Sequence, residues 1–166
     1  MTWPTHQTGA VAAALAFNLS LPAIAASFIG ATVPDIIDQA ISRLMPDKRL
    51  RQKVFNRIHR GNSHWFGWWL FLFLLALSLP IPPLARDLAA GFAIGALSHV
   101  GLDMLTPRGV PFLPVGRTFN IALPVCSTGK FSEYVVLGIL ILSGLLCVFS
   151  FQIVPGGIAA IFACDH

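Results

Sequence analysis

The stretch WFGWWLFLFLLALSLPIPPLA, residues 65–85, decides the fold of this chain because it contains no charged side chain. A helix that crosses a bilayer needs about 20 consecutive apolar residues, and this stretch meets that length. Its tryptophans cluster at one end, and tryptophan favours the level of the lipid headgroups. The stretch therefore predicts a membrane helix that begins at an interface near Trp65 and ends at the turn Pro80-Ile81-Pro82-Pro83.

Three other stretches have a similar character. Residues 7–34 and 134–164 carry no charge, and residues 88–106 are apolar except for one histidine and one aspartate. The chain of 166 residues is 55% hydrophobic and 11% charged, whereas an average soluble domain is about 25% charged. Its mean hydropathy is +0.74. We therefore expect an all-α integral membrane helical bundle, formed by a single domain over residues 1–166.

The apolar stretch 7–34 is interrupted in its middle by Asn18-Leu19-Ser20-Leu21-Pro22. Each half has about 10 residues, which is roughly half a bilayer at 1.5 Å per residue. A continuous span would place His6 and Asp35 on opposite sides of the membrane, whereas a helical hairpin would bring them together. The central break favours the hairpin. We expect this hairpin and about three further membrane helices.

The loop between the hairpin and residue 65 is strongly basic. In a membrane protein this pattern is typical of a cytoplasmic loop. The same charges could also form a site for anionic lipid headgroups or nucleic acid. Nothing in the chain resembles a nucleic-acid-binding module, so nucleic acid is the less favoured partner. The basic residues are Arg43, Lys48, Arg49, Arg51, Lys53, Arg57 and Arg60.

Histidines and carboxylates recur at the ends of different predicted elements, all near the cytoplasmic side. Ionisable groups beside lipid are costly and usually have a partner. A divalent metal is the partner that imidazoles and carboxylates share most readily. The candidate metal ligands are His6, Asp35, His59, His64, His99, Asp103 and Glu133.

Local spacing supports some of these assignments more than others. His99 and Asp103 are four residues apart, so on a helix they share one face and can hold one ion. A buried His–Asp hydrogen bond is the alternative. Asp35 and Asp38 follow Pro34, where aspartates also suit a helix start. We assign Asp35 to the metal, and Asp38 either to general base catalysis or to the orientation of a ligand histidine.

The segment His59-Arg60-Gly61-Asn62-Ser63-His64 places two histidines on either side of a tight turn. Arg60 can clamp a phosphate with its two-pronged guanidinium and neutralise an anionic transition state. Alternatively, Arg60 is simply another basic residue of the loop whose positive charge sets the membrane topology. Glu133 opens the last predicted helix, where the helix dipole alone would also stabilise it.

Several catalytic motifs are absent from the sequence: the Gly-x-Ser-x-Gly elbow, a phosphate-binding glycine loop with lysine, and His-Glu-x-x-His. Serine hydrolases, nucleotide-driven enzymes and common zinc proteases are therefore disfavoured. A site rich in His and Asp with a nearby Arg fits hydrolysis by a water that a metal activates.

The motifs, in their order, resemble the YdjM-like inner-membrane metal-dependent hydrolases. The resemblance runs from His6 to Glu133, and Trp65 departs from it because a serine is expected there. The matching residues are Thr5-His6, Gly30, Pro34-Asp35-Ile36-Ile37-Asp38, His59-Arg60-Gly61-Asn62-Ser63-His64, His99-Val100-Gly101-Leu102-Asp103, Thr106-Pro107-Arg108-Gly109, Gly129 and Glu133.

That family is in turn distantly similar to zinc-dependent phospholipase C and the fungal single-strand nucleases. This similarity implies that Asp35, His99 and Asp103 hold one metal with His64 or His59. It also implies that Asp103 bridges to a second metal near His6.

We therefore expect a multi-pass protein of a bacterial-type inner membrane, with a divalent-metal site that faces the cytoplasm. The expected activity is metal-dependent hydrolysis of a phosphoester, with a membrane lipid as the favoured substrate. Zinc is the first choice because histidine dominates the ligands, although manganese also fits the carboxylates. The rival functions are a divalent-cation transporter, which needs its ligands near the bilayer midplane, and a non-catalytic membrane subunit.

Overall fold

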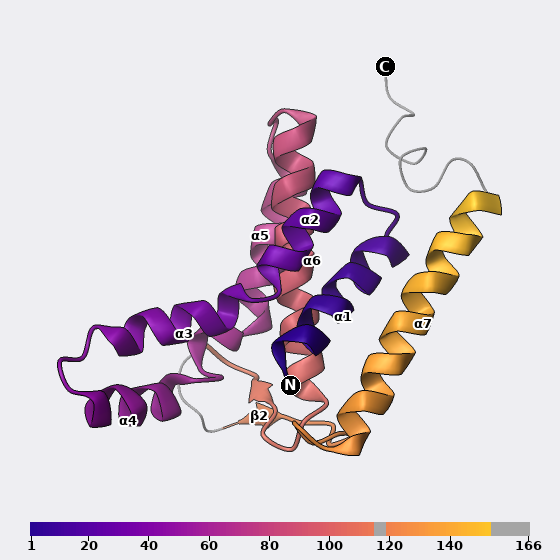
Figure 1. The fold of residues 1–166 in the computed structure, drawn as a ribbon. Helices are drawn as coiled ribbons and strands as arrows, with labels where there is room; N and C mark the ends of the chain where they lie inside the picture. Colours follow the sequence, from indigo (N-terminus) through magenta and orange to yellow (C-terminus); the bar gives the residue numbers. More distant parts are fainter. Residues whose placement is uncertain (115–118, 154–166) are drawn as a thin grey trace.

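The computed structural model describes residues 1–114 and 119–153. Figure 1 shows a bundle of helices and, projecting from its side, a hairpin of two further helices. Within these ranges the structure is mostly helical and also contains one pair of two-residue strands. The elements are α1 (Trp3–Ala16), α2 (Leu21–Gly30), α3 (Val33–Arg43), α4 (Lys48–Ile58), the 3-10 turn η1 (Asn62–His64), α5 (Phe66–Ser78), α6 (Pro83–Met104), β1 (Val110–Pro111), β2 (Asn120–Ile121) and α7 (Phe131–Ile153).

Helices α1 and α2 form the predicted N-terminal hairpin (Figure 1). Asn18 has a φ of 50°, a left-handed conformation that asparagine tolerates better than most residues. Pro22 then lies in the first turn of α2, where its missing N–H group does no harm. The break predicted from the sequence is therefore the tip of the hairpin, and it returns the chain towards the end where α1 began.

Helix α6 is the central element, because it packs against α1, α2 and α5. Its contact with α2 is close enough to require glycine. A Cβ atom on Gly91 or Gly95 would collide with the backbone oxygen of Ala23 or Ser27, respectively. Small residues of this kind let two helix backbones approach closely. This packing places the C-terminal half of α6 beside the end of α2, where the candidate site lies.

Fewer helices than expected are long and apolar enough to cross a membrane. Among the described residues, two segments meet that criterion: Leu21–Arg43, which runs through α2 and α3, and Phe131–Ser150 in α7. Helix α5 has only 13 residues, roughly 20 Å, because prolines follow it closely. Helix α6 has 22 residues but carries charged side chains near both ends. The prediction of about three membrane helices beyond the hairpin is therefore too many by this criterion.

The basic loop contains a helix of its own. Helix α4 packs against α3, and the two form the projecting hairpin (Figure 1). The segment between α6 and α7 contains the antiparallel pair β1–β2. Helix α7 packs against α1. The charge-free stretch 134–164 continues beyond residue 153, outside the described ranges.

Candidate metal centre

The candidate centre lies where the first turns of α1 and α3, the turn η1 and the last turns of α6 meet. Each of these elements contributes a buried side chain, so residues far apart in the sequence converge on one point. Among the described residues, three overlapping groups of three residues each have a spacing that could hold a metal ion. They are Asp35–His64–His99, His6–His99–Asp103 and Asp38–His59–His64.

The atoms of the first group are spaced like ligands of one tetrahedral metal ion. Asp35 Oδ1 lies 3.4 Å from His64 Nε2 and 3.7 Å from His99 Nε2, and the two Nε2 atoms are 3.2 Å apart. Ligand atoms at about 2.0–2.1 Å from a tetrahedral zinc are about 3.3 Å from one another. The three atoms therefore form one face of a tetrahedron that fits an ion without rearrangement.

Hydrogen bonds on the outer sides of the two rings define which nitrogens face the centre. His99 Nδ1 lies 2.6 Å from the carbonyl oxygen of Ala31, which can only accept, so Nδ1 carries the proton. His64 Nδ1 lies 2.9 Å from Ser63 Oγ, and this hydroxyl donates to Asp38 Oδ1 at 2.6 Å. Ser63 Oγ therefore accepts from His64 Nδ1–H. A neutral ring that carries its proton on Nδ1 has a lone pair on Nε2, and in both histidines Nε2 is the nitrogen that faces the centre.

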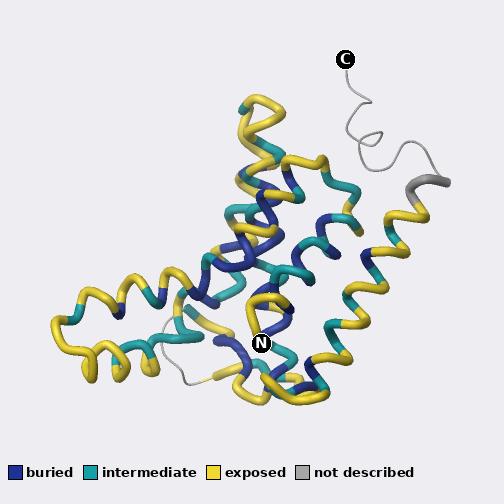
Figure 2. Tube along the Cα trace, viewed as in Figure 1, coloured by how far each residue is buried: buried dark blue, intermediate teal, exposed yellow. Residues whose placement is uncertain are grey.

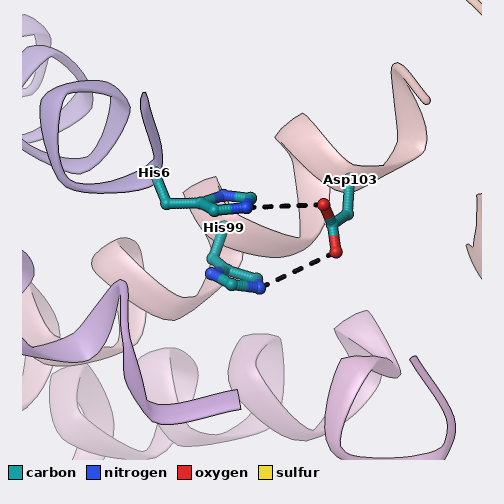
Figure 3. A group of neighbouring side chains, drawn as sticks. All are labelled: His6, His99 and Asp103. Atoms are coloured by element: carbon teal, nitrogen blue, oxygen red, sulfur yellow. Dashed lines mark ion pairs between the residues drawn. The ribbon is translucent and has the colours of Figure 1, made fainter. Parts of the chain in front are cut away.

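Asp103 adds a carboxylate that faces two histidines at once, as Figure 3 shows. Its Oδ1 lies 3.4 Å from His6 Nε2, and its Oδ2 lies 3.8 Å from His99 Nε2 and 3.6 Å from His64 Nε2. The rings of His6 and His99 stack with centroids 3.7 Å apart. Oδ1 also accepts from Arg60 at 2.8 Å and from the Met1 amine at 2.9 Å. Oδ2 is therefore the oxygen better placed to bind an ion beside His64 and His99.

Electrostatics favours the protonation states that bind metal. Burial lowers the pKa of His6 and of His99, despite the opposing negative charge of Asp103. Burial alone would raise the pKa of Asp103, but the hydrogen bond from His6 and the positive charges of the Met1 amine and Arg60 hold it well below its usual range. Neutral imidazoles and an ionised carboxylate are the forms that coordinate divalent ions.

Asp38 and His59 form the outer part of the cluster. His59 Nδ1 lies 3.5 Å from Asp35 Oδ1 and 3.4 Å from Asp38 Oδ2. Asp38 also accepts a hydrogen bond from the backbone N–H of Arg60 at 3.2 Å, in addition to the one from Ser63. Asp38 therefore connects the turn 59–64 to α3, and its hydrogen bond from Ser63 links it to His64.

Arg60 lies at the entrance to the centre. It has a φ of 59°, and its guanidinium donates to Asp103 and to Thr106 Oγ1. An open cavity of about 460 Å³ lies outside it. The lining combines two guanidinium-bearing residues with several hydroxyl-bearing ones, a set suited to an anion. The lining residues are Met1, His59, Arg60, Thr106, Pro107, Arg108, Ser127 and Thr128.

Glu133, which we predicted as a ligand, is not brought into any of the three groups in the described chain. Its carboxylate accepts from the backbone N–H of Thr2 at 2.5 Å, from the hydroxyls of Thr2 and Thr5 at 2.9 Å each, and from the N–H of Gly129 at 2.6 Å. Glu133 therefore joins the start of α7 to the start of α1. In that position it holds the helix that carries His6.

Two further residues support the centre through hydrogen bonds that the sequence alone does not reveal. Ser63 connects His64 to Asp38. Thr106 donates to the carbonyl oxygen of Asp103 and accepts from Arg60. The sequence signal for both is their position inside the motifs 59–64 and 106–109.

Comparisons with known proteins agree with these motifs. The YdjM inner membrane protein family matches residues 1–163. The uncharacterized protein YvsG of Bacillus subtilis (strain 168) is 32% identical over 166 residues, which cover 94% of this chain and 98% of that protein. No solved structure matches the chain. With nearly its whole length matched, the chain belongs to the YdjM inner membrane protein family.

Proposed function

We propose that this protein is a membrane-bound, metal-dependent hydrolase, and that Asp35, His64, His99 and Asp103 hold its central ion. The observation that carries the proposal is the meeting of two imidazole Nε2 atoms 3.2 Å apart beside Asp35 Oδ1. When both rings carry their protons on Nδ1, neither Nε2 atom can donate a hydrogen bond to the other. Among the described residues, Asp35 Oδ1 is buried without a hydrogen-bond partner. Three acceptors directed at one buried point repel one another unless a cation lies between them.

Zinc is the proposed metal because two of the four ligands are imidazoles and the spacing fits tetrahedral coordination. Such an ion polarises a scissile group and lowers the pKa of a bound water to about 7. His6 faces the other oxygen of Asp103, so a second ion there would share that carboxylate. Arg60 and the Met1 amine already engage that oxygen, which makes the second position the weaker one.

A phosphoester is the proposed substrate class because the entrance is cationic and rich in hydroxyls. In this mechanism Arg60 and Arg108 bind the anionic phosphate and position it against the centre. Asp38 holds His64 through Ser63 and does not itself act as the base, because its side chain is only 3% exposed and already accepts two hydrogen bonds. The basic loop supports placing this entrance on the cytoplasmic side.

The test combines metal analysis with activity. We expect the purified protein to contain at least one transition metal per chain, and to cleave a chromogenic phosphodiester or a fluorescent phospholipid in mixed micelles. Asp35→Asn should lose both the metal and the activity. Asp87→Asn is a matched control, because Asp87 binds Ser20 at the opposite end of the hairpin, and it should retain both.

Two outcomes would contradict the proposal. A metal-free protein whose Asp35→Asn variant behaves like wild type would indicate a structural polar network. A metal-loaded protein that cleaves no phosphoester, yet carries divalent ions across liposome membranes, would indicate a transporter.

A further inference from the structure

Helix α3 buries three polar side chains and exposes several apolar ones. Asp35, Asp38 and Ser42 are buried in the protein. On the opposite side, Ile36 is 45% exposed and Leu44, which directly follows the helix, is 78% exposed; Ile37 and Ile41 are exposed as well. Amphipathic helices of water-soluble domains show the reverse arrangement. This face is therefore suited to contact with an apolar environment outside the described chain.

The same hairpin carries a dense positive charge. Figure 2 shows that exposed residues recur along α3 and cover most of α4, and α4 has no buried residue. Between residues 43 and 58 Asp47 is the single acidic residue, whereas six basic residues lie exposed there. The six are Arg43, Lys48, Arg49, Arg51, Lys53 and Arg57. An exposed apolar face flanked by clustered Lys and Arg is typical of a segment that lies in an anionic lipid interface.

We propose that the α3–α4 hairpin docks on the surface of an anionic phospholipid bilayer. Ile36, Ile37, Ile41 and Leu44 enter the boundary between headgroups and acyl chains, while the basic residues bind lipid phosphates. This docking is independent of the proposed hydrolase activity, because the surface lies outside the metal centre. A second copy of the chain is a poorer occupant, since pairing through this face would oppose two sets of like charges.

A cavity beside α3 continues the apolar face towards the metal centre. It has a volume of about 700 Å³, and Ile37, Ile41 and Ile58 contribute to its apolar lining. Arg57 also lines it, as does Ser63, which orients His64. A lipid bound at the docked hairpin would thus meet an apolar path with a cationic group beside it, and that path ends next to the candidate ligands.

The test measures whether this face contacts lipid in the full-length protein. A fluorophore is attached at Leu44→Cys, with Cys126, Cys147 and Cys164 replaced by serine. The protein is placed in nanodiscs whose acyl chains carry a bromine quencher. We expect strong quenching when about a third of the lipid is phosphatidylglycerol and weak quenching in pure phosphatidylcholine.

Charge variants identify the cause of the docking. Each Lys or Arg near an anionic surface contributes about 1 kcal/mol, or roughly five-fold in the docking constant. Replacing Lys48, Arg49, Arg51 and Lys53 by glutamine should therefore weaken docking by on the order of several hundred-fold. The matched control exchanges Lys and Arg at the same four positions, keeps the charge and should dock like wild type.

Three results would overturn the inference: equal quenching in both lipid mixtures, no effect of the four glutamines, or Leu44→Cys cross-linking between two chains instead of quenching. If the glutamine variant does not fold, a salt titration of wild type tests the same charges. Raising the salt from 0.1 M to 1 M shortens the screening length from about 10 Å to about 3 Å, and it should release the hairpin.

Discussion

The hydrogen-bonded chain His64–Ser63–Asp38 offers the sharpest test of how the centre is built. His64 Nδ1 lies 2.9 Å from Ser63 Oγ and 3.5 Å from Asp38 Oδ2. Groups that orient a ligand histidine typically contribute 10- to 100-fold to metal affinity. In Ser63→Ala the imidazole N–H can still turn towards Asp38, so we expect a loss of about 10-fold, or 1.4 kcal/mol.

Asp38→Asn should have the larger effect. The variant removes the charged acceptor at the end of the chain and weakens the hold of α3 on the backbone N–H of Arg60. We expect metal affinity to fall by about 100-fold. The affinity is measured by competition with a chromophoric zinc chelator in detergent, alongside a thermal unfolding curve that shows each variant is folded.

Ser42→Ala is the matched control for Ser63→Ala. Ser42 is also buried on α3, and within the described part of the chain its hydroxyl bonds only to the backbone oxygen of Gln39, so metal affinity should not change. Unchanged affinity in both Ser63→Ala and Asp38→Asn would refute the orienting role. If Asp38→Asn keeps its metal but loses hydrolysis, Asp38 is instead the general base.

Three further predictions follow from the packing and the charges. Gly95→Ala should destabilise the protein by about 1–3 kcal/mol, because the added Cβ would meet the backbone of α2. Gly101→Ala is the control on the same helix: its added Cβ would meet no described atom within 4 Å apart from the adjoining helix backbone, so it should stabilise the protein by about 0.5–1 kcal/mol. Thermal unfolding of both variants in one detergent measures the difference. Removing the metal with a chelator should lower the free energy of unfolding by about 2.7 kcal/mol, compared with protein in free metal at 100 times the dissociation constant. An unfolding temperature that does not change on chelation would contradict a bound ion. Arg60→Ala should keep its metal, measured by mass spectrometry, while hydrolysis falls about 100- to 1,000-fold, and Arg60→Lys should recover only part of the rate because lysine lacks the planar fork.

The sequence by itself determined the local features of this protein. The central break at Asn18–Pro22 predicted the hairpin, and the hydrophobic stretches predicted the helices, because propensity and turn chemistry act over a few residues. The i, i+4 spacing of His99 and Asp103 placed both side chains on one helix face. These two residues do lie together at the end of α6, where their facing atoms are 3.8 Å apart.

Only the tertiary structure decided which atoms meet. Asp38 and Ser63 are 25 residues apart, and Arg60 and Thr106 are 46 apart, so no local pattern shows that they share a hydrogen bond. Glu133 looked like another ligand, but the packing of α7 against α1 carries it to the backbone of Thr2. The direction of each imidazole lone pair likewise depends on partners from other elements, such as the carbonyl of Ala31 beside His99. The sequence therefore identifies residues that can bind a metal, but whether they converge on one ion depends on the packing of helices that are far apart in the sequence.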